Sequence, residues 1–177
     1  MSQTLTPAAP QDLNARRHRL RRYRAVIFDM DGVITDTAGV HAQAWKELFD
    51  GALPAVGALP ANAAVVAADP DVLRPFDAAA DYLHHVDGRP REDGVRTFFA
   101  SRGLQVPEAD APEADAAPEL TVLALAERKQ GYFEQVLERD GVRVFPEAQD
   151  LLERLRAKGV PVALVTSSKN SRAVLTA

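Results

Sequence analysis

Two short apolar runs without helical spacing stand far apart in the chain. The first extends from Ala25 to Phe28 and leads directly into Asp29, and the second extends from Val160 to Val165 and leads into polar residues. Continuous apolar runs of this length are typical of parallel strands that are covered on both faces. The pattern therefore predicts two parallel strands whose carboxyl ends carry polar side chains.

Apolar residues at three- and four-residue spacing predict helices in the segment between these runs. The expected helices are Thr37 to Asp50, Phe76 to His85, Val95 to Arg102, Leu120 to Arg139 and Pro146 to Gly159. Leu53-Pro54 and Leu59-Pro60 predict an irregular insertion with short helical pieces over 51–75. The segment from Pro107 to Pro118 is expected to be an acidic linker. Gly131 is expected to interrupt the helix that contains it. A further helix is expected to begin at about Asn170 or Ser171.

The strands lie more than one hundred residues apart, although a crossover between parallel strands needs only about a dozen. We therefore predict an α/β fold in which a mainly helical cap is inserted after the first strand of an incomplete parallel sheet. The expected domains are a basic N-terminal extension (1–23), a core formed by 24–36 and 142–177, and a helical cap (37–141).

The overall charge favours a small-molecule partner over nucleic acid or a membrane. The 177 residues carry a net charge of -4 and include no cysteine, and the apolar run near the N-terminus is shorter than the roughly 20 residues that span a bilayer. We therefore expect a cytoplasmic protein. An arginine cluster could contact RNA or an anionic membrane, but a solvated helical extension is the simpler interpretation; its members are Arg16, Arg17, Arg19, Arg21, Arg22 and Arg24.

Two carboxylates follow the first strand on alternate residues. Asp29 ends the apolar run, Asp31 comes two residues later, and Gly32 permits a sharp turn. A carboxylate can attack phosphorus, and a second acid can protonate the leaving oxygen. Adjacent acids in loops are more often merely solvated, so this spacing alone is a weak signal.

Hydroxyl and amide residues follow the second strand and precede a helix. These residues are Thr166, Ser167, Ser168, Lys169 and Asn170. Such a run can bind a phosphate through hydroxyls and backbone N–H groups, and it can also simply cap the helix. The two interpretations are compatible.

With its flanking residues, the segment Arg24 to Thr37 resembles the haloacid dehalogenase superfamily, and within it the beta-phosphoglucomutase-like group. The resemblance implies a Rossmann-like core, an aspartyl phosphate on Asp29, general acid/base chemistry by Asp31, and Mg²⁺ held by Asp29 and the carbonyl of Asp31. It also implies that Thr166 binds phosphate and that Ser168, Lys169 and Asn170 continue that motif.

The same resemblance assigns roles to residues of the cap. The segment Tyr82 to Arg96 resembles a substrate loop, in which Gly88 belongs to the turn and Arg91 would bind a distal phosphate. The remaining assignments are Thr37 at the hinge, His41 as a residue that helps to orient Asp31, Trp45 in the lining of the sugar pocket, and Lys129 as a cap lysine. Without the resemblance, the loop residues would be interpreted as a polar surface turn, His41 and Trp45 as packing residues of a helix, and Lys129 as a solvated lysine.

Three functions follow from these expectations: a hexose phosphate mutase, a sugar-phosphate phosphatase, or a non-catalytic binding protein. The family pattern requires a lysine and an acidic pair beyond the second motif, and Ala177 precedes both. We therefore expect the N-terminal part of a longer enzyme, with weak activity and an incomplete sheet open to self-association.

Overall fold

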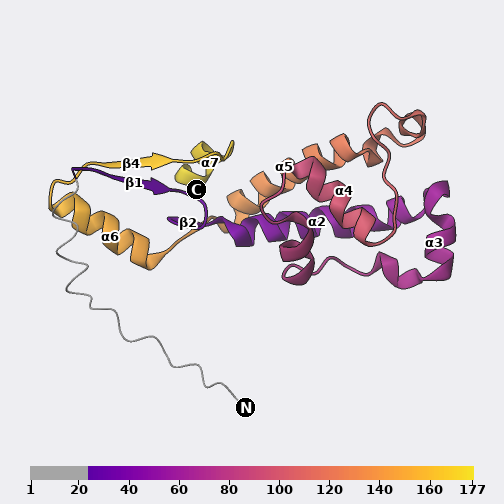
Figure 1. Cartoon of the computed structure of the whole chain (residues 1–177), viewed down its shortest axis with the longest axis horizontal. Coiled ribbons are helices and arrows are strands. Elements are labelled where there is room, and N and C mark those ends of the chain that lie inside the picture. The colour runs from indigo at the N-terminus through magenta and orange to yellow at the C-terminus, as the bar shows by residue number, and fades with distance from the viewer. Residues whose placement is uncertain (1–23) are drawn as a thin grey trace, which may run out of the picture.

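The computed structural model describes residues 24–177, so the predicted N-terminal extension (1–23) lies outside the described residues. Two lobes are visible (Figure 1), and the smaller contains strands β1 (Val26–Asp29) and β4 (Val162–Val165) with helices α6 (Pro146–Ala157) and α7 (Ser171–Thr176). The two strands pair in parallel, with Asp29 opposite Val165. The expected parallel pairing and both helices are therefore confirmed.

One expectation about this sheet is wrong for the described residues. Phe28 is buried, but Ile27 and Val165 are 68% and 61% exposed. The reason is that β1 and β4 form a two-stranded sheet in residues 24–177, and α6 packs against β4 while other parts of both strands stay uncovered. Although β1 and β4 consist mainly of apolar residues, they are therefore not buried on both faces.

The larger lobe is built from helices and short helical turns. Its principal helices are α2 (Thr37–Gly57), α3 (Ala63–Ala68), α4 (Arg91–Ser101) and α5 (Val122–Asp140). Between them lie the 3₁₀ turns η2 (Pro60–Asn62), η3 (Pro70–Leu73), η5 (Pro112–Ala116) and η6 (Pro118–Leu120), and the π-helix η4 (Tyr82–Val86). The α/β class with an inserted, mainly helical lobe is therefore confirmed.

Helix α2 is longer than the sequence pattern indicated. It continues through Pro54 to Gly57 instead of ending near Asp50. A proline inside a helix loses one hydrogen bond and strains the preceding turn. Here Leu53 and Val56 are buried in the helical lobe, so apolar burial compensates for the proline near the end of the helix.

Three other helices also differ from the prediction. The segment predicted as a helix from Phe76 instead forms a π-helix beginning at Tyr82, and α4 begins at Arg91 rather than Val95. Helix α5 continues through Gly131 without interruption, because one glycine costs only about 1 kcal/mol while the buried face of α5 is long. Linker 107–118 contains 3₁₀ turns.

The chain crosses between the lobes twice, at neighbouring places. Strand β2 (Thr35–Asp36) leads into α2, and β3 (Arg143–Val144) follows α5; the two strands pair antiparallel. The Arg143 guanidinium also forms an ion pair with the Asp36 carboxylate. The entry to the helical lobe and the exit from it are thereby tied together.

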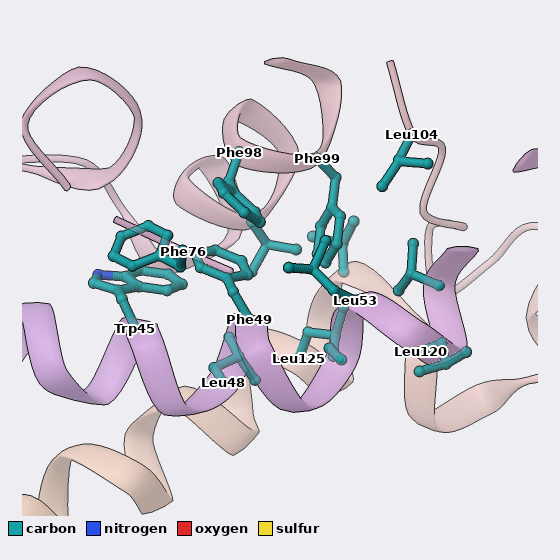
Figure 2. Close-up of a cluster of buried hydrophobic side chains, with 14 of the residues drawn as sticks. Trp45, Leu48, Phe49, Leu53, Phe76, Phe98, Phe99, Leu104, Leu120 and Leu125 are labelled. Atoms are coloured by element: carbon teal, nitrogen blue, oxygen red, sulfur yellow. The ribbon is translucent and has the colours of Figure 1, made fainter. Parts of the chain in front are cut away.

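A cluster of aromatic rings forms the centre of the helical lobe (Figure 2). Phe49 of α2 stacks on Trp45 at 5.0 Å and on Phe98 of α4 at 3.9 Å between ring centroids. Phe76 and Phe99 close the cluster from two sides. This packing fixes the orientation of Trp45, whose other neighbours belong to the site described below.

Within residues 24–177 no single helix is both long enough and apolar enough to cross a membrane. Two successive helical segments, Thr37–Gly57 and Pro60–Ala68, are long and apolar enough only when they are taken together, and they are bent by 85° relative to each other. Residues of the first helix are buried in the aromatic cluster.

A buried ion pair fixes the segment that leads into η4. The Arg102 guanidinium donates to the Asp81 carboxylate at 2.7 Å, and the two side chains are 2% and 9% exposed. Arg102 also donates to the carbonyls of Val72 and Arg74. One arginine therefore holds together three parts of the loop that follows α3.

We predict that Asp81→Ala lowers the free energy of unfolding by about 3 kcal/mol, because it leaves a buried guanidinium without its counter-ion. Urea denaturation measures the change. Asp150→Ala is the matched control, since Asp150 pairs with Arg154 on an exposed surface and should change stability by less than about 1 kcal/mol. Equal effects of the two substitutions would contradict a stabilising role for the buried pair.

Candidate active site

A cavity of about 480 Å³ is lined by residues of both lobes. The smaller lobe contributes the loop after β1 and the loop after β4, and the helical lobe contributes α2, η4, α5 and the loop between η4 and α4. Its lining residues include Asp31, Thr37, His41, Trp45, Gly88, Arg91, Lys129, Ser167, Ser168, Lys169 and Asn170. Every predicted site residue except Asp29 and Thr166 therefore lines this cavity.

The two predicted acids occupy the carboxyl end of β1. Asp29 is exposed and its Oδ1 accepts a hydrogen bond from the Met30 N–H at 2.8 Å. Gly32 has φ of 73°, and the Met30 carbonyl accepts from the N–H groups of Ile34 and Thr35. This tight turn brings Asp31 to the cavity, while Asp29 stays at the strand end beside it.

Hydroxyl groups from two different elements hold the Asp31 carboxylate. Thr37, the first residue of α2, donates to Asp31 Oδ1 at 2.8 Å, and Thr166 donates to Asp31 Oδ2 at 3.4 Å. Thr166 thus lies against the acid pair although it does not line the cavity. The structure brings the first and second polar motifs together, as the parallel pairing of β1 and β4 requires.

The loop after β4 is organised by its own hydroxyl groups. Thr166 Oγ1 accepts from the Ser168 N–H at 3.0 Å, and Ser168 Oγ accepts from the Asn170 N–H at 3.2 Å. The expected capping of the helix is not observed, since the Asn170 side chain makes no capping bond to α7; the hydroxyls instead satisfy backbone donors within the loop. The same arrangement presents Ser168, Lys169 and Asn170 to the cavity.

Lys129 and His41 form the wall of the cavity in the helical lobe. Lys129 Nζ lies 2.7 Å from His41 Nδ1, and its side chain is almost fully buried. The ammonium also lies over the rings of Trp45 and Phe133, at 5.2 and 5.0 Å from their centroids. Lys129 is thus not the solvated lysine that its type alone would indicate.

Burial changes the protonation of this pair. Desolvation, followed by the positive charges of Lys129 and Arg91, lowers the pKa of His41 to about 3. Desolvation and then Arg91 lower the pKa of Lys129 to about 7. His41 is therefore neutral at physiological pH; when Lys129 is protonated, it donates to His41 Nδ1 and the proton of the ring is then on Nε2.

The loop between η4 and α4 supplies further polar groups. Gly88 has φ of 67°, and the half-buried Arg91 begins α4. Tyr82 lies in the π-helix, and its burial and the nearby Asp87 carboxylate raise the pKa of its hydroxyl. Irregular helical turns of this kind often occur at functional sites.

Several residues of the site were not identified from the sequence as having a role. Tyr82, Asp87 and Arg89 line the cavity, and Gly94 matters because a Cβ there would lie 3.0 Å from the Trp45 ring. Tyr82 to Arg96 was predicted as a substrate loop, so the segment was found but not its individual contacts. Those contacts depend on α2, which lies far away in sequence.

We predict that the free energy of unfolding of the parent protein increases between pH 7 and pH 9. The increase should exceed that of Lys129→Met by about 2 kcal/mol. With a folded pKa of about 7 and an ordinary value near 10.4, the unfolded chain binds the extra proton over this range, so raising the pH favours the folded state. Urea denaturation at the two pH values measures it. Lys158→Met is the control, since Lys158 is exposed, and parallel pH profiles for Lys129→Met and the parent would contradict the burial of a charged amine.

The chain is similar in sequence to a known family of enzymes. The family model of haloacid dehalogenase-like hydrolases matches residues 23–176. Beta-phosphoglucomutases of Mycobacterium bovis and Mycobacterium tuberculosis are each 43% identical over 154 residues, covering 87% of this chain and 55% of theirs. The chain thus spans about half the length of these relatives.

Solved structures show the same fold at low sequence identity. CbbY from Rhodobacter sphaeroides, in complex with xylulose-(1,5)bisphosphate, is 18% identical with a TM-score of 0.55, over 87% of this chain and 56% of that one. A putative phosphoglycolate phosphatase from Lactobacillus delbrueckii is 23% identical with a TM-score of 0.52, over 87% and 58%. By the match of its sequence over nearly all described residues, the chain belongs to the haloacid dehalogenase-like hydrolases.

Proposed function

We propose that this protein transfers a phosphoryl group on a hexose phosphate, with Asp29 as nucleophile and Asp31 as general acid and base. The observation that carries the proposal is the position of Asp31, which two threonine hydroxyls hold at the edge of a cavity lined by cationic side chains. The 43% identity to beta-phosphoglucomutases supports the same substrate class.

The proposed reaction assigns one role to each acid. An oxygen of the Asp29 carboxylate forms a bond to phosphorus while the bond between phosphorus and the sugar oxygen breaks. Asp31 gives its proton to that leaving oxygen and later removes a proton from the accepting hydroxyl. The hydrogen bonds from Thr37 and Thr166 fix the orientation of Asp31 for both steps.

Mg²⁺ is the proposed cofactor, and the residues of the site fit it in part. Within residues 24–177 no group of three or more acidic, histidine or cysteine side chains could hold a metal. The Asp29 carboxylate and the backbone carbonyl of Asp31 are oxygen donors, and Mg²⁺ commonly uses one or two carboxylates together with water and substrate phosphate. When bound, the ion would neutralise charge on the phosphoryl group.

The cationic groups of the helical lobe suit a second anionic end of the substrate. Arg91 carries a planar fork that can form paired hydrogen bonds to phosphate oxygens, and Lys169 of the loop after β4 also lines the cavity. The cavity of about 480 Å³ is within the usual range for small-molecule sites. Trp45 and Gly88 would contact the sugar between the two ends.

The mutase and phosphatase reactions differ only in the acceptor. A hydroxyl of a second sugar position accepts the phosphoryl group in a mutase, and water accepts it in a phosphatase. The 43% identity to beta-phosphoglucomutases supports the mutase, in which water must be kept from the phosphorylated carboxylate. A binding protein without turnover is the third candidate, consistent with the incomplete set of metal ligands in the described chain.

The remaining expectations about the surroundings of the protein stay predictions. These are a cytoplasmic location, a small-molecule partner without nucleic acid or membrane, and self-association through the sheet. The last is supported by the exposure of Ile27, Val162 and Val165 on β1 and β4, since uncovered strands tend to pair with other chains.

We predict that Asp29→Ala lowers turnover of beta-glucose 1-phosphate by at least about 1000-fold, because the nucleophile is lost. Product analysis separates the candidates: glucose 6-phosphate indicates the mutase, and glucose with inorganic phosphate indicates the phosphatase. Asp150→Ala is the control for loss of an acidic side chain. Unchanged turnover in Asp29→Ala would contradict the proposed nucleophile, and binding without turnover in the parent would favour the third candidate.

We predict that Arg91→Ala weakens binding of glucose 6-phosphate by about 10-fold or more, since a charge-assisted hydrogen bond contributes about 1.5 to 3 kcal/mol. Arg91→Lys should recover part of the loss without the paired geometry. Fluorescence of Trp45, the one tryptophan of the chain, reports the titration. Arg96→Ala is the control on the same helix, because Arg96 pairs with Asp93 and Glu108, and an equal effect there would contradict a specific role for Arg91.

A further inference from the structure

A pair of side-chain amides links the helical lobe to the loop after β4. Gln130 of α5 donates from Nε2 to Asn170 Oδ1 at 2.7 Å. Asn170 lines the cavity, and Gln130 directly follows Lys129 in the sequence. This contact therefore joins the two lobes at the site.

Glu134 determines how the Gln130 amide is oriented. Gln130 Nε2 donates a second bond to Glu134 Oε1, also at 2.7 Å. A carboxylate accepts hydrogen bonds and does not donate them, so Glu134 requires the NH₂ group of Gln130 on its side. One of the two Nε2 hydrogens of Gln130 is then donated to Glu134, and the other is donated to Asn170.

This orientation in turn determines the amide of Asn170. Because Gln130 donates, Asn170 turns its carbonyl oxygen toward α5, and its own Nδ2 has only a long contact of 3.5 Å to Gln130 Oε1. An amide nitrogen carries two donors, so the Asn170 NH₂ group retains capacity to donate to an anion. The Glu134 carboxylate is thus connected through the Gln130 amide to Asn170, which lines the cavity.

Further hydrogen bonds continue this chain into the acid pair. The Asn170 N–H donates to Ser168 Oγ, the Ser168 N–H donates to Thr166 Oγ1, and Thr166 donates to Asp31. Thr37 then donates to the other oxygen of Asp31. A connected series runs from α5 through the polar loop to the start of α2, and it crosses between the lobes at Gln130 and again at Thr37.

We propose that Gln130 is a positioning residue that orients the Asn170 amide for an anion and holds the helical lobe against the loop after β4. The geometry of the two amides carries this inference, and its conformational part does not depend on the proposed phosphoryl transfer. Loss of the Gln130 amide should loosen the helical lobe against the loop after β4, while β2 and β3 still join the lobes, and should leave the Asn170 amide free to rotate.

The absence of cysteine in the chain allows a direct measurement of lobe separation. Ala100 on α4 and Ala157 on α6 are exposed, and Ala100→Cys with Ala157→Cys would carry one spin label on each lobe. Gln130→Met keeps the length and helix propensity of the side chain but removes the amide. We expect a longer or broader distance distribution in Gln130→Met than in the labelled parent, without any ligand present.

Gln149→Met is the matched control, because Gln149 is exposed on α6 and donates to Glu153, which lies four residues later, as Gln130 donates to Glu134. It should leave the distribution unchanged. Asn170→Ala should reproduce the effect of Gln130→Met, and the double substitution should add nothing further, since both remove the same contact. Asn170→Ala also serves if Gln130→Met does not fold, as judged by circular dichroism, because the Asn170 side chain makes no capping bond to α7.

Phosphate binding tests the positioning role. With inorganic phosphate and Mg²⁺ as the probe and Trp45 fluorescence as the readout, Gln130→Met should weaken affinity by about 5-fold, the effect expected of one neutral hydrogen bond. Parent-like distances in both Gln130→Met and Asn170→Ala would overturn the contact between lobes. Altered distances with parent-like phosphate affinity would overturn the positioning of Asn170 and leave the proposed reaction untouched.

Discussion

The packing of α2 against α5 is the interaction on which both the fold and the site depend. Its central cluster contains Val40 and Ala44 of α2 and Phe133, Val136 and Leu137 of α5. Met30 from the turn after β1 and Val174 from α7 are buried in the same cluster. The junction therefore contains apolar residues from both lobes, and it sets the position of the helical lobe relative to the acid pair.

The functional side chains occupy the polar continuation of these two helices. His41 is one residue beyond Val40 on α2, and Lys129 is one turn before Phe133 on α5; the His41 ring stacks on Phe133 at 4.5 Å. The apolar cluster thus brings a lysine and a histidine together in a poorly solvated place. The same burial that stabilises the junction lowers the pKa of both groups.

The acid pair is held by groups that come from opposite ends of the described sequence. The Thr37 and Thr166 hydroxyls both donate to Asp31, one through the start of α2 and one through the end of β4. Parallel pairing of β1 with β4 places Asp29 opposite Val165, so the loop containing Thr166 must begin beside the acids. The arrangement follows from strand register, and the Gln130 amide adds a further tie from the helical lobe.

The amino-acid sequence by itself determined the local features: two apolar strands, the terminators of α6, the acids after β1 and the polar run after β4. Each depends on neighbouring residues and the periodicity of the chain. Only the tertiary structure decided that α2 passes through Pro54, that Ile27 is exposed, that Lys129 is buried against His41, and that Gln130 meets Asn170. These outcomes depend on burial and contacts between residues 40 to 88 positions apart, and local propensity contains no information about such contacts.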